Sequence, residues 1–318
     1  MNKELIVIAG ATATGKSAVA VALADIIGGE IISADSMQVY KYMDIGTAKP
    51  PKEDLERIRH HLIDVAEPDY SFNAAVFTDM AKAAVDDILS RGKRPILAGG
   101  TGFYINALIY NNDFSINAPE KNTELREELY KTYASKSPEE AFVDLVKIDP
   151  EYAVTTHANN IKRVLRAIEY YYETGEKFSV YNARNKLNRQ NAYDFKMFVL
   201  SRDRAKMYNA INTRVDKMVE AGLVDEVKGL LNMGYGEGLT SMEGLGYKEI
   251  LAYLDNKATL TEAVENIKLG TRRFAKRQVT WFKNQNEAIW LDIDDYNNPA
   301  DLAAKINDYL NNNGDVYE

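Results

Sequence analysis

The string GATATGKS occupies residues 10–17, between an apolar run and a stretch with helical apolar spacing. The run LIVIA (5–9) predicts a buried strand, and residues 16–27 predict a helix. The glycines permit a tight turn whose backbone N–H groups converge on an anion at the positive end of that helix. In this context the spacing G-x-x-x-x-G-K-S is typical of a phosphate-binding loop. It does not say whose phosphate is bound.

Within this loop the side chains of Lys16 and Ser17 have distinct expected roles. The ammonium of Lys16 adds a positive charge aimed at the phosphates, and the hydroxyl of Ser17 is expected on the side of a Mg²⁺ ion. The phosphate-binding residues predicted from the motif are Gly10, Ala11, Thr12, Ala13, Thr14, Gly15, Lys16 and Ser17.

Four more short apolar runs predict further strands of the same sheet: 30–36, 94–100, 195–201 and 288–292. Continuous apolar strands separated by helical patterns indicate a parallel sheet covered on both faces. The expected fold is therefore α/β, a P-loop NTPase-like core built from residues 1–112 and 195–318. Residues 113–194 are Tyr-rich, polar and helical in pattern, so they predict a helical insertion domain.

Composition excludes several kinds of chemistry. The chain has no cysteine and three histidines, which excludes disulfides, Cys-ligated zinc and thiol nucleophiles. No apolar run approaches the roughly 20 residues needed to cross a membrane, and no leader pattern precedes the first strand, so we expect a cytoplasmic protein. The net charge of −8 disfavours nonspecific coating of nucleic acid but leaves room for a local basic patch.

The second strand ends at an acidic residue, Asp35. In an open α/β sheet this position faces the ligand crevice. A carboxylate there can serve beside magnesium, as a helix cap or as a general base, and the position alone does not choose between these roles.

Seven motifs that occur in a fixed order along the chain narrow the possible roles of Asp35 and the possible families. They are GATATGKS, DSMQVYKYMDIGTAKP (35–50), HHLID (60–64), GGTGFYINAL (99–108), NNIKRVLRAIE (159–169), GLGYKE (244–249) and KRQVTWF (276–282). Together they resemble the bacterial tRNA dimethylallyltransferases over nearly the whole chain. Many relatives have proline at Ala11 and threonine at Ser17, and neither difference removes a needed group.

The resemblance implies a reaction and a set of roles. A dimethylallyl group would pass from dimethylallyl diphosphate to N6 of the adenosine 3′ to a tRNA anticodon, with pyrophosphate leaving and Mg²⁺ as cofactor. Asp35 would be the base that takes the N6 proton, since an aspartate is ordinarily ionised at neutral pH. Thr12 would help to hold the amine or the diphosphate. Arg214 matches an arginine near the diphosphate, although its position also suits an ordinary surface charge on a helix.

By the same resemblance the anticodon loop is contacted from several segments, and the target base is extruded into a channel. Two stretches supply basic surface: residues 157–189, with a net charge of about +4, and residues 268–283, with about +6. Thr123 equally suits a helix cap, and the stripe of Phe274, Gln278 and Trp281 favours a buried core contact over a role in binding. The tRNA contacts implied are Asp35, Ser36, Met37, Gln38, Thr101, Thr123, Asn159, Asn160, Ile161, Lys162, Arg163, Arg273, Lys276 and Arg277.

Three other functions compete with this one. A P-loop small-molecule kinase would use ATP as donor and Asp35 as base, and an adenylate prenyltransferase would act on free AMP or ADP. Both leave the insertion and the basic segments without a role. A non-enzymatic RNA-binding protein gives no reason for the loop and Asp35 to occur together. We expect the chain to bind the tRNA anticodon stem-loop and dimethylallyl diphosphate as a monomer.

Overall fold

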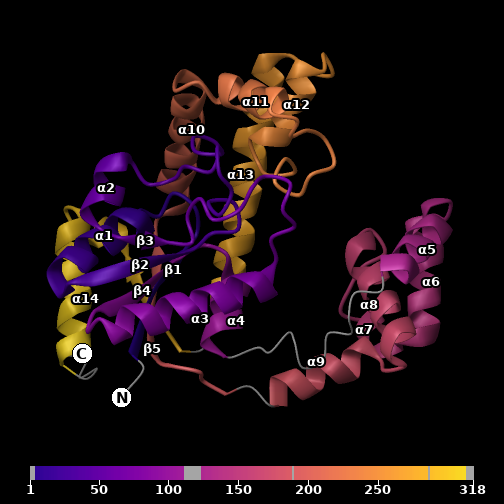
Figure 1. The fold of residues 1–318 in the computed structure, drawn as a ribbon, viewed down its shortest axis with the longest axis horizontal. Coiled ribbons are helices and arrows are strands. Elements are labelled where there is room, and N and C mark those ends of the chain that lie inside the picture. The colour runs from indigo at the N-terminus through magenta and orange to yellow at the C-terminus, as the bar shows by residue number, and fades with distance from the viewer. Residues whose placement is uncertain (1–3, 111–122, 188–189, 286, 313–318) are drawn as a thin grey trace. The chain divides into compact units, whose positions relative to one another are not determined.

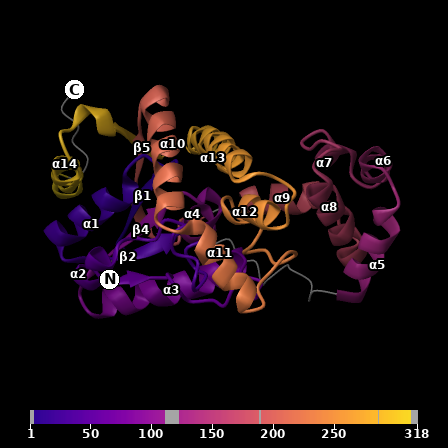
Figure 2. The ribbon, with the colours of Figure 1, turned by 90° about the horizontal axis from the view of Figure 1, so that it is seen from above.

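The computed structural model describes residues 4–110, 123–187, 190–285 and 287–312. The chain folds as two compact units, one formed by residues 1–109 with 191–318 and the other by residues 110–190. Figures 1 and 2 show the ribbon from two directions. Among the described residues, no helix is both long and apolar enough to cross a membrane.

The first unit is built on a parallel sheet of six strands in the order β3-β2-β4-β1-β5-β6. All five predicted runs form strands, so the α/β fold is confirmed. The two-residue strand at His60–His61 was not predicted, because a His-His pair carries no apolar signal. The strands are β1 (Glu4–Gly10), β2 (Gly29–Ala34), β3 (His60–His61), β4 (Arg94–Gly99), β5 (Asp194–Ser201) and β6 (Ala288–Asp292).

Helices cover both faces of this sheet. The step from β1 to β2 runs in one direction across the sheet, whereas the chain later returns in the other direction to β5 and β6. Because crossovers between parallel strands are right-handed, a reversal of direction places the connecting helices on opposite faces. The helices of this unit are α1 (Lys16–Ile27), α2 (Lys52–Arg57), α3 (Ala74–Ser90), α4 (Gly102–Ile109), α10 (Arg204–Glu220), α11 (Leu223–Asn232), α12 (Tyr247–Leu254), α13 (Leu260–Phe282) and α14 (Pro299–Asn311), with a 3-10 turn η1 (Ile293–Asp295).

The main core lies between the sheet and the pair α1 and α14. Alternate residues of β1, Ile6 and Ile8, point into it, together with Leu23 of α1 and Ile306 of α14. Figure 1 shows α1 and α14 lying together at one side of the sheet. This packing holds α1 against the sheet, and the phosphate-binding loop leads directly into α1.

A buried carboxylate stabilises the β2–β3 edge of the sheet. It lies at the start of β2, at the opposite end of the strands from the phosphate-binding loop. Glu30, at the start of β2, forms ion pairs with Arg91 and Lys93 and a hydrogen-bonded pair with His61 of β3. The hydrogen bond with Arg91 is the largest cause that holds the pKa of Glu30 well below its usual range. The HHLID motif thus has a structural role, since it ties the short strand β3 to β2.

The second unit consists of helices only in its described part, as the pattern predicted. Their core includes Leu145, Val164 and Ile168. A capping box at Ser137 and Glu140 starts one of these helices and explains where it begins. The helices are α5 (Thr123–Ala134), α6 (Pro138–Ile148), α7 (Pro150–Ala153), α8 (Ile161–Thr174) and α9 (Phe178–Leu187).

Candidate active site

The phosphate-binding loop spans the gap between β1, which ends at Gly10, and α1, which begins at Lys16. Gly15 has φ of 75°, in the left-handed region that favours glycine, and this conformation turns the chain into the helix. The buried hydroxyl of Thr14 donates a hydrogen bond of 2.8 Å to the carbonyl of Ala11 and closes the turn. The structure thus has a tight turn between a buried strand and the first residue of a helix, and phosphate binding by this loop stays a prediction.

Lys16 lies half-buried beneath this loop. Its ammonium donates to the Ala11 carbonyl at 3.4 Å. Burial lowers the pKa of Lys16 to about 8, and the charges of Asp35, which raises it, and Arg214, which lowers it, contribute less. A diphosphate would add negative charge beside Lys16 and favour its protonated form.

Thr12 is held from two sides. Its hydroxyl accepts a hydrogen bond of 3.1 Å from the guanidinium of Arg214 on α10. Its backbone N–H donates to the side-chain oxygen of Gln278 on α13 at 2.9 Å. Burial is the main cause that lowers the pKa of Arg214, with an opposing contribution from Asp35. Arg214 therefore lines the cavity beside Thr12, which favours the predicted place near the diphosphate over an ordinary surface charge.

Gln278 also forms a hydrogen bond to the segment that follows β4. Its side-chain N–H donates to the carbonyl of Gly100 at 2.8 Å, just after β4. Gln278 is buried, as favoured from the sequence, but it serves as a polar bridge between the phosphate loop and the segment after β4. Helical spacing places Gln278 in the stripe but does not reveal its two partners.

Asp35 follows directly after β2, and its carboxylate begins a tight turn. The Oδ1 atom accepts hydrogen bonds from the N–H groups of Met37 at 2.9 Å and Gln38 at 3.4 Å. The next residue, Ser36, donates its N–H to the hydroxyl of Thr101 at 3.1 Å. These bonds fix Asp35 at the carboxyl ends of the strands, where the fold places ligands.

One cavity of about 380 Å³ is lined by Thr12, Lys16, Asp35, Arg214 and Gln278. Polar and cationic side chains lie at the phosphate loop, and Asp35 faces the same space. Apolar side chains of α10 and α13 form another part of the wall, and these two helices pack side by side (Figures 1 and 2). The apolar lining residues of the two helices are Ile211, Val215, Met218, Ile267 and Phe274.

The comparisons with known proteins decide the family. The sequence model described as IPP transferase matches residues 38–285. The chain belongs to the IPP transferase family. Named relatives are the tRNA dimethylallyltransferases of Alkaliphilus oremlandii, 46% identical with 96% of each chain covered, and of Lachnoclostridium phytofermentans, 47% identical with 96% of each chain covered.

Solved structures of IPP transferases agree. The full-length tRNA isopentenylpyrophosphate transferase of Bacillus halodurans is 38% identical, with 98% of this chain and 96% of that chain covered, at a TM-score of 0.71. A eukaryotic dimethylallyltransferase described as acting on tRNA is 31% identical, with 100% of this chain and 81% of that chain covered, at a TM-score of 0.83. The predicted family and the P-loop-like fold are both confirmed.

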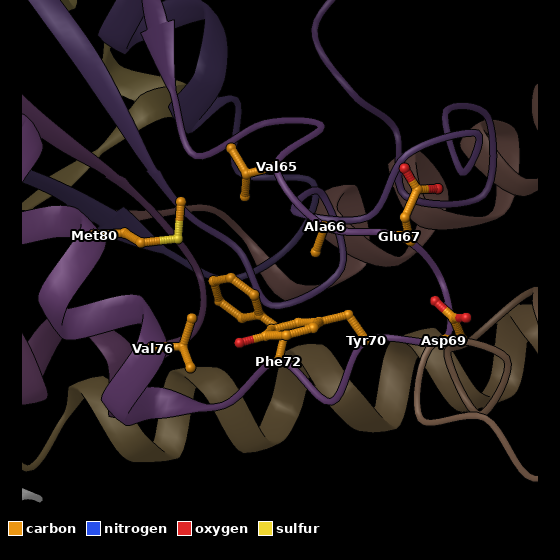
Figure 3. A pocket seen from close by; sticks show the side chains of 8 residues that line it. All are labelled: Val65, Ala66, Glu67, Asp69, Tyr70, Phe72, Val76 and Met80. Atoms are coloured by element: carbon orange, nitrogen blue, oxygen red, sulfur yellow. The ribbon is translucent and has the colours of Figure 1, made fainter.

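A second hollow, of about 500 Å³, is lined by eight residues from the range 65–80 (Figure 3). Val65, Phe72, Val76 and Met80 gather on one side of it, and the carboxylates of Glu67 and Asp69 lie on the other. None of its eight described lining residues is basic. It therefore lacks the charge needed to hold a diphosphate, and the cavity at the phosphate loop remains the candidate site of this IPP transferase.

The structure brings together only some of the predicted tRNA contacts. Asp35, Ser36, Met37, Gln38, Thr101 and Arg277 line the cavity with the phosphate loop. Arg273 and Lys276 are exposed on α13 outside the cavity lining.

The other predicted contacts belong to the second unit. Residues 159–163 lie at the start of α8, where Lys162 and Arg163 are exposed. Thr123 is the first residue of α5, and its side chain lies outside the described part, as does all of Arg189 in the first basic stretch.

Proposed function

We propose that this chain transfers a dimethylallyl group from dimethylallyl diphosphate to N6 of the adenosine 3′-adjacent to the anticodon in tRNAs, releasing pyrophosphate. The observation that carries the proposal is one cavity that joins the cationic phosphate loop, an apolar wall and the carboxylate of Asp35. The names of the relatives supply the transferred dimethylallyl group and the tRNA.

The phosphate loop binds the diphosphate of the donor. Loop N–H groups, Lys16 and Arg214 face the oxygens on which negative charge grows as the bond from C1 to oxygen breaks. The five-carbon tail lies against the apolar side chains of α10 and α13. A loop of this kind then stabilises a leaving pyrophosphate and needs no nucleoside triphosphate.

Mg²⁺ belongs to the proposal, with Ser17 as its protein ligand. Ser17 is exposed and lines the cavity, and among the described residues no group of three or more Asp, Glu, His or Cys side chains is placed to hold a metal ion. One hydroxyl together with diphosphate oxygens and waters is a donor set that suits Mg²⁺. When bound, the ion would neutralise charge on the diphosphate.

Asp35 acts as the general base. The two backbone hydrogen bonds that it accepts from described residues end on Oδ1, so we assign the proton to Oδ2. As N6 forms its bond to C1 of the donor, the N6 proton passes to Asp35 and the electron pair of the C1–O bond leaves with pyrophosphate. Thr12, fixed by Arg214 and Gln278, keeps the diphosphate or the amine in line.

In this proposal one copy of the chain binds the tRNA without a partner subunit. The target base is flipped out of the anticodon loop into the cavity. Asp35, Ser36, Met37, Gln38 and Thr101 surround the base, and Arg277 lies at the same cavity. Further proposed tRNA contacts are Thr123, Asn159, Asn160, Ile161, Lys162, Arg163, Arg273 and Lys276.

The function is tested by offering labelled dimethylallyl diphosphate with unmodified tRNA, with AMP and with ATP in separate reactions. We expect label in the tRNA only. Label in AMP would support an adenylate prenyltransferase, and ATP turnover without prenyl transfer would support a kinase; either result contradicts the proposal.

The base is tested with Asp35→Asn. Asparagine keeps the oxygen that accepts the N–H groups of Met37 and Gln38, so the turn stays in place while the proton acceptor is lost. We expect single-turnover transfer to fall by roughly 10²-fold or more, with tRNA binding retained. Transfer at the wild-type rate would remove Asp35 from the role of base.

A further inference from the structure

A loop beside the cavity is bound by a carboxylate from a distant part of the chain. Glu226, on the first turn of α11, accepts hydrogen bonds from three successive backbone N–H groups: Asp44 at 2.8 Å, Ile45 at 2.7 Å and Gly46 at 3.1 Å. Three converging N–H groups form an anion-binding concavity, and here a side chain of the same protein fills it. Glu226 thereby fixes the position of the loop that starts at Asp44.

Tyr247 completes this contact from a third segment. Its hydroxyl donates to Glu226 at 2.7 Å, and its ring is fully buried. A Cβ atom on Gly46 would lie 2.6 Å from that ring, so Gly46 has to be glycine for the loop to approach. We call Glu226, Tyr247 and residues 44–46 the carboxylate clasp.

The residues after the clasp hold Gln38. The carbonyl of Ala48 accepts the Gln38 side-chain N–H at 3.2 Å, and the carbonyl of Thr47 accepts it at 3.5 Å. The other end of the same amide accepts from the hydroxyl of Ser33 at 2.9 Å. Both the place and the rotation of the Gln38 amide therefore depend on where residues 47 and 48 lie.

Gln38 is in turn linked to Asp35, since its backbone N–H is one of the two donors to Asp35 Oδ1. A continuous chain of contacts thus runs from Glu226 through the loop to Gln38 and Asp35. Glu226 itself is absent from the cavity lining, whereas Gly46, Thr47, Ala48 and Tyr247 belong to it, so Glu226 influences the cavity through the residues that it holds.

We infer that Glu226 is a positioning residue for the acceptor side of the reaction, which acts on the tRNA base through residues 44–48 and Gln38. This inference rests on the proposed function. The clasp makes no hydrogen bond to the phosphate loop among the contacts of the described residues, so donor binding should not depend on it. A positioning error of the acceptor side lowers turnover without a change in donor affinity.

The test compares Glu226→Gln with a neighbouring control, Asp225→Asn. The amide that E226Q introduces would place an N–H₂ group against backbone N–H donors, so part of the clasp opens. Asp225 is 81% exposed and pairs only with Lys228 among described residues, at 3.3 Å. We expect kcat/KM for tRNA to fall roughly tenfold or more in E226Q, with less than about twofold change in the dissociation constant for pyrophosphate and no effect in D225N.

A double-mutant cycle with Gln38→Ala decides whether the effect passes through Gln38. If it does, the double variant transfers the prenyl group about as fast as Q38A alone. Losses that multiply, or an E226Q enzyme that binds pyrophosphate more weakly by the same factor as it loses tRNA turnover, would overturn the inference.

Hydrogen exchange separates this inference from the proposed function, because it needs no activity. In the wild-type chain the amides of residues 44–46 should be protected, and E226Q should make the peptide that covers them exchange faster while Tyr247→Phe changes it less. Unchanged exchange in a folded E226Q protein would overturn the inference. Loss of protection in a protein that never prenylates tRNA would refute the proposed function alone.

Discussion

At the scale of single residues, the buried charge of Lys16 lowers the free energy of unfolding near neutral pH. The ammonium is half-buried near the guanidinium of Arg214, and burial lowers its pKa from 10.5 to about 8. Because the folded state binds this proton less tightly than the unfolded chain does, Lys16 destabilises the fold below about pH 8. That penalty is relieved as the pH rises from about 8 to 10.5.

We therefore predict that Lys16→Met increases stability while it abolishes transfer. Removal of a half-buried cation should raise the free energy of unfolding near neutral pH by about 1–3 kcal/mol in the absence of donor. Urea unfolding measures this change, and the single-turnover assay measures the loss of transfer. A less stable K16M protein would contradict this account of Lys16.

The pH dependence of donor binding provides the second arm of this prediction. The protonated ammonium is the form that attracts a diphosphate, so the dissociation constant for pyrophosphate should rise by up to about tenfold per pH unit above about pH 8. In K16M this rise should be absent. Titration calorimetry on both proteins, at pH values on either side of that pKa, checks the comparison.

At the scale of elements, α13 combines two functions on different faces. Gln278 faces inward and binds the backbone of the phosphate loop, whereas Arg273 and Lys276 are exposed. Part of the basic stretch predicted to face RNA is used inside the protein: Lys268 pairs with Asp216 at 2.8 Å, and Arg272 donates to Asn212 at 2.6 Å. The formal count of about +6 for this stretch therefore overstates the charge available for phosphates.

We predict that Gln278→Leu weakens both the fold and donor binding. The change leaves the N–H of Thr12 and the carbonyl of Gly100 without their partner, which should cost about 2–4 kcal/mol in unfolding free energy. The KM for dimethylallyl diphosphate should rise by roughly tenfold, because Thr12 loses one of its two supports.

Thr280→Ala is the matched control for this change, since Thr280 is exposed on the same helix. It should change stability by no more than about 0.5 kcal/mol. Thermal unfolding and steady-state kinetics on the two variants give the comparison. Equal losses of stability and equal rises in KM in the two variants would contradict a specific role of Gln278, because any substitution on α13 would then have the same effect.

How far the sequence predicts these elements depends on the range of the interactions. Strands β1 and β4 follow from their own apolar residues, and the loop between β1 and α1 follows from its glycines. His60–His61 becomes a strand only because Glu30 and the β2 backbone lie beside it. Arg214 and Glu226 read as ordinary helix charges, since their partners lie 202 and 181 residues away along the chain. Local pattern cannot reveal such contacts.

At the scale of the whole molecule, both this chain and its proposed tRNA substrate carry net negative charge. The net charge is −8, so the proposed binding of tRNA requires localised cations. In the second unit some of these are held by neighbouring acids, as Arg166 is by Glu169 and Arg184 by Glu176. Lys162 and Arg163 are exposed at the start of α8 and are the residues proposed to contact tRNA there.

We predict that Lys162→Glu combined with Arg163→Glu weakens tRNA binding by roughly tenfold or more at moderate salt. The slope of log K against log salt should become shallower by about 1–2, because up to two phosphate contacts are lost. Pyrophosphate binding should stay unchanged. Filter binding at several salt concentrations measures the slope.

The charge-matched control is Lys131→Glu with Lys147→Glu, two exposed lysines of the same unit. This pair should leave both the affinity and the slope close to those of the wild type. If the control lowers the affinity for tRNA as much as the α8 pair does, the loss comes from the overall charge of the unit. Lys162 and Arg163 would then make no specific contact with tRNA.

The carboxylate clasp also limits how this protein can change over generations. Residues 46, 226 and 247 meet in space, although most of the chain separates the first from the others. A larger residue at 46 is tolerated only if the ring at 247 shrinks in the same lineage, so the positions are free to drift only together. Recombination between relatives with a crossover inside this interval would join halves that were never fitted to each other.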